Sequence, residues 1–443
     1  MTHRISILLV AFVIVACKGQ PNFVQSKQKA FQKTTYENVK IYESNGQGLG
    51  PCEPSIYINP TNTENIVAGS IVDYVHYSND GGKTWKTDRL VSSMGVWGDP
   101  CIVADNEGHF YYLHLSDPDG TNWHSENVLD RIVIQRSDDG GKTWNDGAGV
   151  GLNNAKEQDK EWAAINPETN EIYVTWTEFD QYASADPKDK TRILFSLSSD
   201  KGATWTTPVA INQFDGNSID DDQTVEGAVP AVADDGSIYV AWAYNNMIYF
   251  DKSIDGGKTW LDEDIIVSEQ PEGWAHDIPG LGRSNGMPVT AVDISNSEYK
   301  GTIYVNWADQ RNGKNNTDVF IAKSTDGGIT WSDPLRVNTD NTTTHQFLTW
   351  MSVDPKTGYV YIVYYDRSKY KDNQTDVVLS VSYDGGETFV SKTISEKPFT
   401  PVISGVFFGD YNNIYAYDGI VRPVWTRYEK GKLSVWTALI EDK

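Results

Sequence analysis

Acidic residues stand directly before several strand-like stretches of this sequence, and such side chains gathered at one place could perform acid–base chemistry. The segments are GPCEP (50–54), WGDP (97–100), TVEGAVP (224–230) and FFGDYN (407–412), and their reactive side chains are Glu53, Asp99, Glu226, Asp410 and Tyr411. Crowded carboxylates raise the pKa of one among them, so that it can act as a general acid near neutral pH. A second carboxylate can act as nucleophile or base, and cleavage of a glycosidic bond uses such a pair.

Further polar and aromatic residues are expected beside these acids. They lie in similar leading segments, in the loop 269–285, or just after strand-like stretches: Trp97, Glu161, Trp162, His276, Arg283, Arg311 and Arg367. We expect them to bind a substrate in one pocket, and the long segments 116–130 and 178–191 to form its wall. The alternative is that charged residues at strand ends only pair with one another.

Metal ligands are not expected in this pocket. His114, His124 and His276 have no spacing typical of a metal site, so we predict no cofactor. The run SIDDDQ (218–223) offers oxygen ligands that Ca²⁺ prefers, and it is either a structural calcium loop or a solvated acidic loop.

The elements that must position these residues are repeats. Six segments share one pattern, SNDGGKTW from Ser78 and its copies, whose aspartates recur every 55 to 71 residues: Asp80, Asp139, Asp200, Asp255, Asp326 and Asp384. This period fits one four-stranded blade of a β-propeller. Ser and Asp side chains bond nearby backbone N–H groups and glycines supply positive φ, so we interpret the motif as a structural turn between the last two strands of a blade.

Upstream of the motifs, segments such as 163–176, 230–242 and 351–364 alternate in polarity around a polar turn and predict the first two strands of each blade. Residues 405–440 supply three more strands without a motif, and 36–43 can supply the fourth. We therefore predict an all-β propeller of seven blades over residues 36–443, with six blades as the alternative. Trp176, Trp242, Trp307, Tyr364 and Trp425 should pack between blades.

The first residues have the character of an export signal. Residues 1–17 combine a positive start, a short apolar run and Ile14-Val15-Ala16-Cys17, which resembles a bacterial lipobox in which Cys17 is lipidated. Residues 18–35 are expected to be a flexible tether. We thus expect a bacterial cell-envelope protein, anchored to a membrane by lipid, and monomeric. Cys52 and Cys101 would form a disulfide or stay as two separate thiols.

The charge limits the partners. A net charge of −24 argues against nucleic acid as a ligand, because phosphates need a basic surface. It also means that any site for an anion must be a local basic island.

The six motifs resemble the BNR, or Asp-box, repeat of the sialidase-like superfamily, and from residue 36 onward the chain is similar to bacterial envelope proteins of the exo-α-sialidase type. The resemblance implies a glycan-acting hydrolase, with Asp99 as acid/base, Glu226 as partner of Tyr411, and three carboxylate-binding arginines: Arg283, Arg311 and Arg367. The Arg-containing segment that opens the first blade of sialidases is replaced here by Glu53-Pro54-Ser55-Ile56. We therefore retain two alternatives, a non-catalytic propeller that binds glycan or protein, and a polysaccharide lyase.

Overall fold

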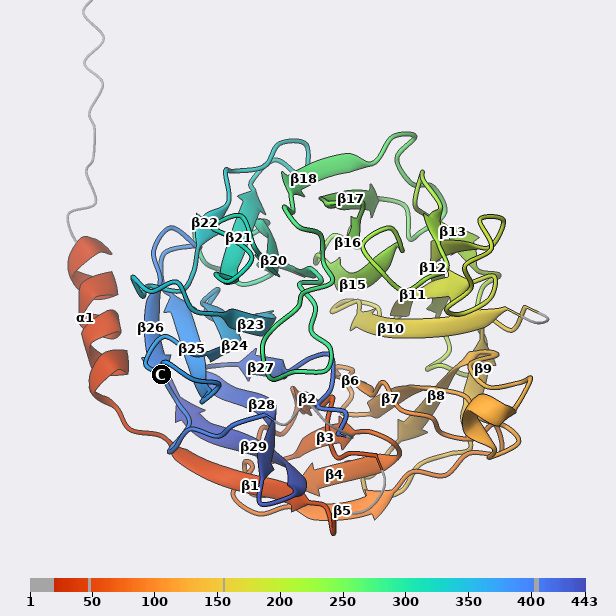
Figure 1. Ribbon diagram of the computed structural model, residues 1–443, viewed down its shortest axis with the longest axis horizontal. Helices are drawn as coiled ribbons and strands as arrows, with labels where there is room; N and C mark the ends of the chain where they lie inside the picture. The colour runs from red at the N-terminus through yellow and green to blue at the C-terminus, as the bar shows by residue number, and fades with distance from the viewer. Residues whose placement is uncertain (1–19, 47–48, 154–155, 402–405) are drawn as a thin grey trace, which may run out of the picture.

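The strands of this protein form seven antiparallel sheets around one axis (Figure 1). The computed structural model describes residues 20–46, 49–153, 156–401 and 406–443. Each sheet has four strands in its main path, and the third gains one short extra strand, β14. The innermost strands of successive blades contact one another around the whole ring. The predicted seven-bladed propeller is confirmed, and the six-bladed alternative is wrong.

The elements are as follows. Blade one holds β2 (Ser55–Ile58), β3 (Ile66–Ser70), β4 (Tyr74–Ser78) and β5 (Lys86–Arg89); blade two β6 (Cys101–Ala104), β7 (Phe110–Leu115), β8 (Ile132–Ser137) and β9 (Ala148–Val150); blade three β10 (Glu157–Ile165), β11 (Ile172–Phe179), β12 (Lys190–Ser198), β13 (Val209–Ala210) and β14 (Gly216–Asn217). Blade four holds β15 (Glu226–Val232), β16 (Ile238–Tyr244), β17 (Met247–Ser253) and β18 (Ile265–Glu269); blade five β19 (Val289–Val292), β20 (Ile303–Asp309), β21 (Asp318–Ser324) and β22 (Leu335–Arg336). Blade six holds β23 (Gln346–Val353), β24 (Val360–Asp366), β25 (Asp376–Ser382) and β26 (Val390–Thr393); blade seven β27 (Asn413–Tyr417), β28 (Ile420–Glu429), β29 (Lys432–Glu441) and β1 (Glu37–Glu43); the helices are α1 (Gln20–Lys33) and the 3₁₀ turn η1 (Asn122–His124).

The repeated motif is a structural turn in all six copies, as predicted. In the first copy, Ser78 Oγ donates to Asp80 at 2.8 Å and accepts from Gly82 N at 2.9 Å. Asp80 also accepts the backbone N–H and the hydroxyl of Thr84, and Trp85 Nε1 donates to Gly82 O. These bonds use the carboxylate within its own hairpin, so it is not available for chemistry.

Large aromatic side chains fill the space between blades. The five predicted ones are each at most 1% exposed: Trp176, Trp242, Trp307, Tyr364 and Trp425. Burying an aromatic side chain of this size stabilises the fold by several kcal/mol, roughly 3–5 by the usual cost of truncation to Ala. They are packing residues and not ligand platforms.

Blade seven joins the two ends of the described chain. Strand β1 pairs antiparallel with β29, in a register that runs from Glu37↔Leu439 to Glu43↔Ser434, with an irregularity at Ile41. Ile41 is buried in the core of this blade. The predicted closure of the ring by the first strand and the last three strands is thereby confirmed. Strand β29 lies between β28 and β1, so it has a partner on both sides.

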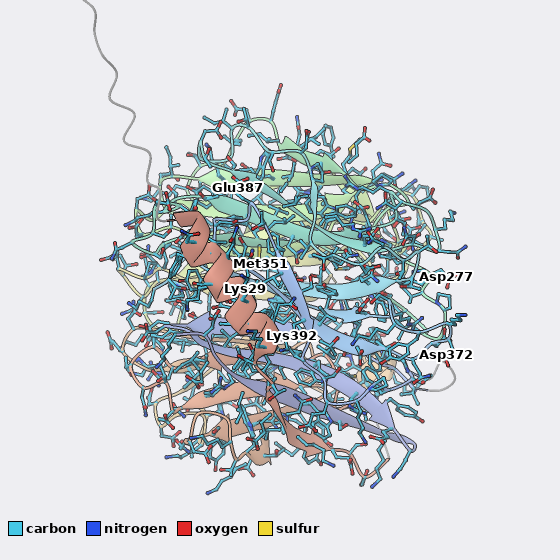
Figure 2. All side chains as sticks on the ribbon, turned by 90° about the vertical axis from the view of Figure 1, so that its left-hand side faces the viewer. Lys29, Asp277, Met351, Asp372, Glu387 and Lys392 are labelled. Carbon is cyan, nitrogen blue, oxygen red and sulfur yellow. The ribbon has the colours of Figure 1, made fainter. Side chains whose placement is uncertain are left out.

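The prediction of a flexible tether over residues 18–35 is wrong where the structure describes it. Residues 20–33 form α1, which runs along the side of the ring beside β26 (Figure 2). Phe31 is 3% exposed, and Lys392 Nζ donates to the carbonyl oxygens of Phe31 and Gln32. Gln32 Nε2 in turn donates to Ser391 O at 3.0 Å. Gln, Lys and Ala have good helix propensity, and this docking contact stabilises the helix they form.

Two further expectations concern the cysteines and the membrane. Cys52 and Cys101 are both buried and free, so the disulfide is not formed. Cys17 and its apolar run lie outside the described residues, and the lipid anchor stays a prediction. In the described ranges, no helix combines the length and the apolar composition that a membrane span needs.

Candidate functional site

Residues just before or near the beginning of several innermost strands have an unusual backbone conformation. Glu53, Asp99, Lys160 and Leu348 all have φ between 49° and 55°. A left-handed conformation costs a residue with a side chain about 1–2 kcal/mol, and such strain collects at functional sites. Four blades carry this strain at corresponding places, which indicates a functional site where these segments meet.

A cavity of about 270 Å³ opens at the end of the axis where these segments converge. Its lining comes from leading segments and from loops that follow second strands: Leu49, Glu53, Ile71, Val72, Trp97, Asp99, Leu115, Trp123, Leu129, Asp159, Lys160, Tyr182, Arg283, Phe407 and Asp410. Trp123 and Tyr182 belong to the two long segments predicted to form a wall, and their rings stack with centroids 5.5 Å apart. That prediction is confirmed.

Lys160 is the centre of the acidic side of the cavity. Its Nζ lies 3.0 Å from Asp99 Oδ2, 3.3 Å from Asp410 Oδ2 and 3.8 Å from Asp159 Oδ2. The ladder between β10 and β11 shifts register between Asp159 and Trp162, and this bulge turns the lysine side chain inward. One ammonium group therefore holds carboxylates from three blades.

Arg283 is the second cation of the cavity. Its Nε lies 3.0 Å from Asp410 Oδ1, and its Nη1 lies 3.0 Å from Asp220 Oδ2. Asp220 also accepts a 2.6 Å hydrogen bond from the hydroxyl of Tyr182. The acidic run 218–223, which was expected to be a calcium loop or a solvated loop, uses Asp220 to hold the cavity wall. Among the described residues, no three His, Cys, Asp or Glu side chains are arranged so that they could hold a metal ion.

The connection between β18 and β19 crosses the same end of the ring (Figure 1). Asn285 Nδ2 donates to Asp410 O at 2.8 Å, and Arg367 Nη1 donates to Pro279 O at 2.5 Å. These bonds fix the connection to blades six and seven. It carries Arg283, so it also supplies one wall of the cavity.

The cavity separates its carboxyl groups into two protonation states. Burial raises the pKa of Asp159 to about 7, and burial together with Asp99 and Asp410 raises the pKa of Glu53 well above its usual value. Burial would also raise the pKa of Asp410, but Arg283 and Lys160 outweigh it and hold that pKa below its usual value. Neighbouring acids with opposite shifts are typical of an acid and a base that act together.

Asp159 should make stability depend on pH. An unfolded aspartate loses its proton near pH 3.9, whereas folded Asp159 holds it to about pH 7. The stabilisation that comes from the protonated Asp159 side chain is therefore complete below about pH 4 and is lost as the pH rises through 7. We expect the melting temperature of the wild type to fall over this range more steeply than that of Asp159→Asn. Parallel curves for the two proteins would contradict the pKa shift.

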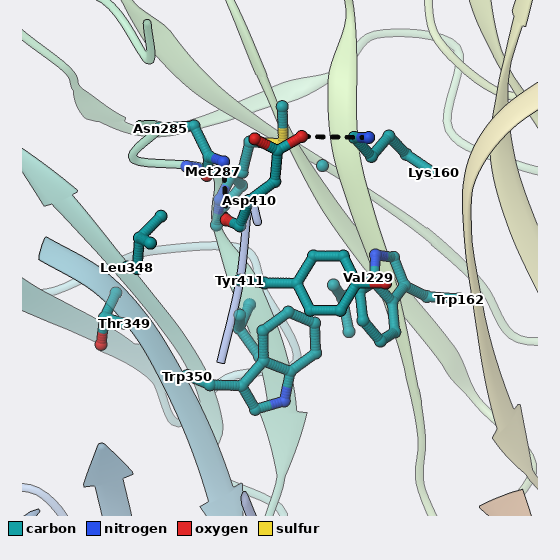
Figure 3. Close-up of a pocket in the computed structure, with 13 residues that line it drawn as sticks. Lys160, Trp162, Val229, Asn285, Met287, Leu348, Thr349, Trp350, Asp410 and Tyr411 are labelled. Atoms are coloured by element: carbon teal, nitrogen blue, oxygen red, sulfur yellow. Dashed lines mark hydrogen bonds and ion pairs between the residues drawn. The ribbon is translucent and has the colours of Figure 1, made fainter. Parts of the chain in front are cut away.

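A narrow pocket lies beneath this cavity, and Figure 3 shows it. Its volume is only about 20 Å³. Tyr411 stands in it against Trp162, with ring centroids 5.0 Å apart, and against Trp350 at 6.0 Å. Asp410 and Lys160 line both pockets, so the tyrosine ring forms part of the floor below the acids. Trp162, which was expected to bind substrate, lines this narrow pocket and not the larger cavity.

Glu226 and Tyr411, expected as partners, are not joined by a hydrogen bond in this structure. Both carboxylate oxygens of Glu226 and the hydroxyl of Tyr411 are buried, and within the described chain none of these atoms has a hydrogen-bond partner. Neither residue lines the larger cavity. Glu161 is likewise fully buried with both oxygens unpaired. Burial raises the pKa of Glu161 and Glu226 well above the usual value, so both are expected to be neutral.

The three arginines expected to bind a carboxylate are not brought together at this cavity, since only Arg283 lines it. Arg311 pairs with Asp309 and donates to Glu269 O at 2.9 Å. Arg367 is bound to the carbonyl of Pro279. His276 is buried, and its Nε2 lies 3.2 Å from Gly273 O in the same loop. It does not line the cavity.

Of the predicted residues, the structure brings together those that lead into blades one, two and seven, with one arginine: Glu53, Trp97, Asp99, Arg283 and Asp410. Sequence reasoning missed Lys160, Trp123, Tyr182 and Asp220 as site residues. A signal existed for Lys160, since QDKEW is the leading segment of blade three, but a lysine between two acids is usually a solvated residue.

The comparisons with known proteins agree with this fold. The model of the BNR/Asp-box repeat matches residues 76–87, which contain the whole of the first motif. Among curated proteins, the search finds no relative of this chain. Among solved structures, the chain is similar to an ulvan lyase, a polysaccharide lyase, with 14% identity, a TM-score of 0.55, and coverage of 92% of this chain and 96% of that one.

Two other solved structures are similar over most of the chain. A variant of the NanB sialidase from Streptococcus pneumoniae has 9% identity and a TM-score of 0.51, with 85% of this chain and 83% of that chain covered. A protein of unknown function from Dyadobacter fermentans has 17% identity and a TM-score of 0.50, with 79% and 98% covered. At such identities the similarity shows the shared fold and not the activity.

Proposed function

From the Asp-box repeats and the sialidase-like propeller fold of this chain, we propose that the protein is a glycoside hydrolase whose active site is the cavity at the axis. The observation that supports this most is the division of its acids into a protonated group and an ionised group. Glycosidic cleavage needs a proton donor for the leaving oxygen and a carboxylate that acts as nucleophile or base.

The geometry suggests a role for each acid. Asp159, with its pKa near 7, is the proposed proton donor. Asp410, kept ionised by Arg283 and Lys160, is the proposed nucleophile or base. Asp99 shares Lys160 with Asp410 and fixes the position of that ammonium group. The cavity of about 270 Å³ is near the lower limit for a small-ligand site, so it has room for about one sugar ring.

Aromatic rings at the rim would hold the sugar by stacking. Trp123 is 55% exposed and packs on Tyr182, which leaves part of the indole open to a ligand. We expect Trp123→Ala to weaken substrate binding about tenfold, since one aromatic stacking contact contributes roughly 0.5–1.5 kcal/mol. The effect should fall on KM more than on kcat. Ile254→Ala, which removes an exposed apolar side chain from a motif hairpin, is the control and should change neither.

A panel of oligosaccharides and aryl glycosides tests the proposal itself. Hydrolysis of an oligosaccharide releases a reducing sugar without an ultraviolet chromophore, and hydrolysis of an aryl glycoside releases a free sugar and a phenol. The second candidate is a polysaccharide lyase, which the similarity to the ulvan lyase fold favours. A lyase would release an unsaturated uronate that absorbs in the ultraviolet. Binding without either product would indicate the third alternative, a glycan-binding propeller without catalytic activity.

A further inference from the structure

Helix α1 turns one face to the ring and the other to solvent. The docked residues follow the spacing of a single helical face and are at least partly buried: Val24, Lys27, Gln28 and Phe31. The residues of the opposite face are exposed, and they include Ser26, Lys29 and Lys33. The spacing therefore fixes which side of the helix remains available to a partner.

Contacts along the docked face hold α1 in place. Lys27 Nζ lies 3.5 Å from Asp442 Oδ1 and 5.4 Å from the ring centroid of Tyr359, so a cation–π attraction adds to an ion pair. Gln28 Nε2 donates to Thr388 Oγ1 at 3.2 Å. With the bonds of Lys392 and Gln32 described above, these contacts run along most of the helix. Its outward face is thus a fixed part of the rim of the ring.

This outward face is basic, although the molecule is acidic. Helix α1 contains three lysines and no acidic residue, whereas the whole chain has a formal net charge of −24. Within the described ranges, Lys27 pairs with Asp442, but neither Lys29 nor Lys33 takes part in an ion pair. The side chain of Phe23 is 49% exposed on the same helix. Lysines beside an exposed aromatic ring suit a helix that lies on anionic lipid headgroups.

The predicted lipid at Cys17 brings a membrane close to this face. Gln20, the first residue of α1, follows Cys17 by three positions, so even a fully extended connection keeps the start of the helix within roughly 11 Å of the lipidated residue. On the basis of this predicted anchor, we propose that the outward face of α1 rests on the headgroups of the membrane and that the rim of blade six faces the bilayer.

This placement also determines where the cavity opens. Strand β26 is the outermost strand of blade six, and α1 lies outside it on the rim (Figure 1). A membrane in contact with α1 is therefore beside the ring, and the axis of the ring runs along the membrane. The cavity at the end of the axis then opens beside the bilayer and neither toward it nor away from it.

Fluorescence quenching by labelled lipid tests this orientation. The full chain is purified with its lipid and inserted into vesicles of phosphatidylcholine and phosphatidylglycerol that contain a lipid with a nitroxide on its headgroup. Ser26→Cys places a fluorophore on the outward face of α1, and Val209→Cys places one on an outer strand of blade three, across the ring. Cys52 and Cys101 are buried and stay unlabelled. We expect quenching at least about threefold stronger at residue 26 than at residue 209.

Several results would overturn the proposal. Equal quenching at the two positions, or stronger quenching at residue 209, would place another part of the rim on the membrane. A purified full chain whose mass shows no lipid, or a lipidated chain that is washed from the vesicles, would remove the basis of the proposal. None of these measurements follows a reaction, so the orientation can hold or fail independently of the proposed hydrolase.

A reversal of charge tests the contact itself. The double variant Lys29→Glu with Lys33→Glu makes the outward face acidic, and repulsion from phosphatidylglycerol should lower the quenching at residue 26 at least about twofold. Lys142→Glu with Lys258→Glu is the matched control, because it changes the net charge equally at exposed positions in two motif hairpins, and it should leave the quenching unchanged. Equal quenching in the two double variants would contradict contact between this face and the headgroups.

Discussion

Replacement of Asp410 by Asn should lower the rate of glycoside hydrolysis by about 10³-fold, within the range of loss expected when an acid–base group is removed. Asp410 is 3% exposed, and its carboxylate meets both Arg283 and Lys160 at 3.0 to 3.3 Å. An amide in its place has the same shape but cannot act as nucleophile or base. Initial rates on the best substrate of the panel, at saturating concentration, measure the loss in kcat.

The control for this prediction is Asp138→Asn, which changes the net charge equally at a site more than half exposed. Its rate should equal that of the wild type. The melting temperature of Asp410→Asn must also be measured, because the change leaves Lys160 and Arg283 each with one anionic partner fewer. A folded Asp410→Asn protein with near wild-type kcat would show that the ionised carboxylate is not used in the reaction.

Removal of β1 should have the largest effect on stability. A chain that begins at residue 45 lacks the strand that pairs with β29, and it also loses buried Ile41. The ten-residue strand β29 would then present an open edge, which both destabilises the blade and invites association with other chains. We expect this chain to aggregate or to melt at least about 10 °C below the full chain.

A chain that begins at residue 35 is the matched control. It lacks α1 but keeps β1, so it loses the contact with β26 and not the closure of the ring. Its melting temperature should fall by a few degrees at most. Similar melting temperatures for both shortened chains would mean that the pairing of β1 with β29 contributes little to stability.

The blades could be predicted from the sequence because the information for each is local. Every motif contains the serine, aspartate and glycines that form its own turn, and the alternating stretches before it specify two strands. The closure of the ring could also be predicted, because three strands without a motif at one end of the chain and one alternating strand at the other end complete a sheet. Local rules of this kind transfer from blade to blade.

The site could be predicted only in part, because its contacts join distant segments. The position of the acids before the first strands placed Asp99 and Asp410 correctly at the axis. The orientation of Lys160 depends on a bulge and on a left-handed residue, and neither has a clear sequence signal in QDKEW. The family resemblance placed Glu226 beside Tyr411, but both side chains are buried without a hydrogen-bond partner. It also grouped three arginines, of which Arg311 pairs with Asp309 and Arg367 donates to Pro279 O, and only Arg283 reaches the cavity.

The joint construction of blade seven also has a consequence for the order of events during folding. Residues 37 and 439 are paired although about 400 residues separate them along the chain. During synthesis the first strand must therefore wait, with its edge unsatisfied, until the last hairpin has been made, and the entropic cost of joining such distant segments is met late. An open arc of six blades is therefore the arrangement expected before blade seven closes the ring.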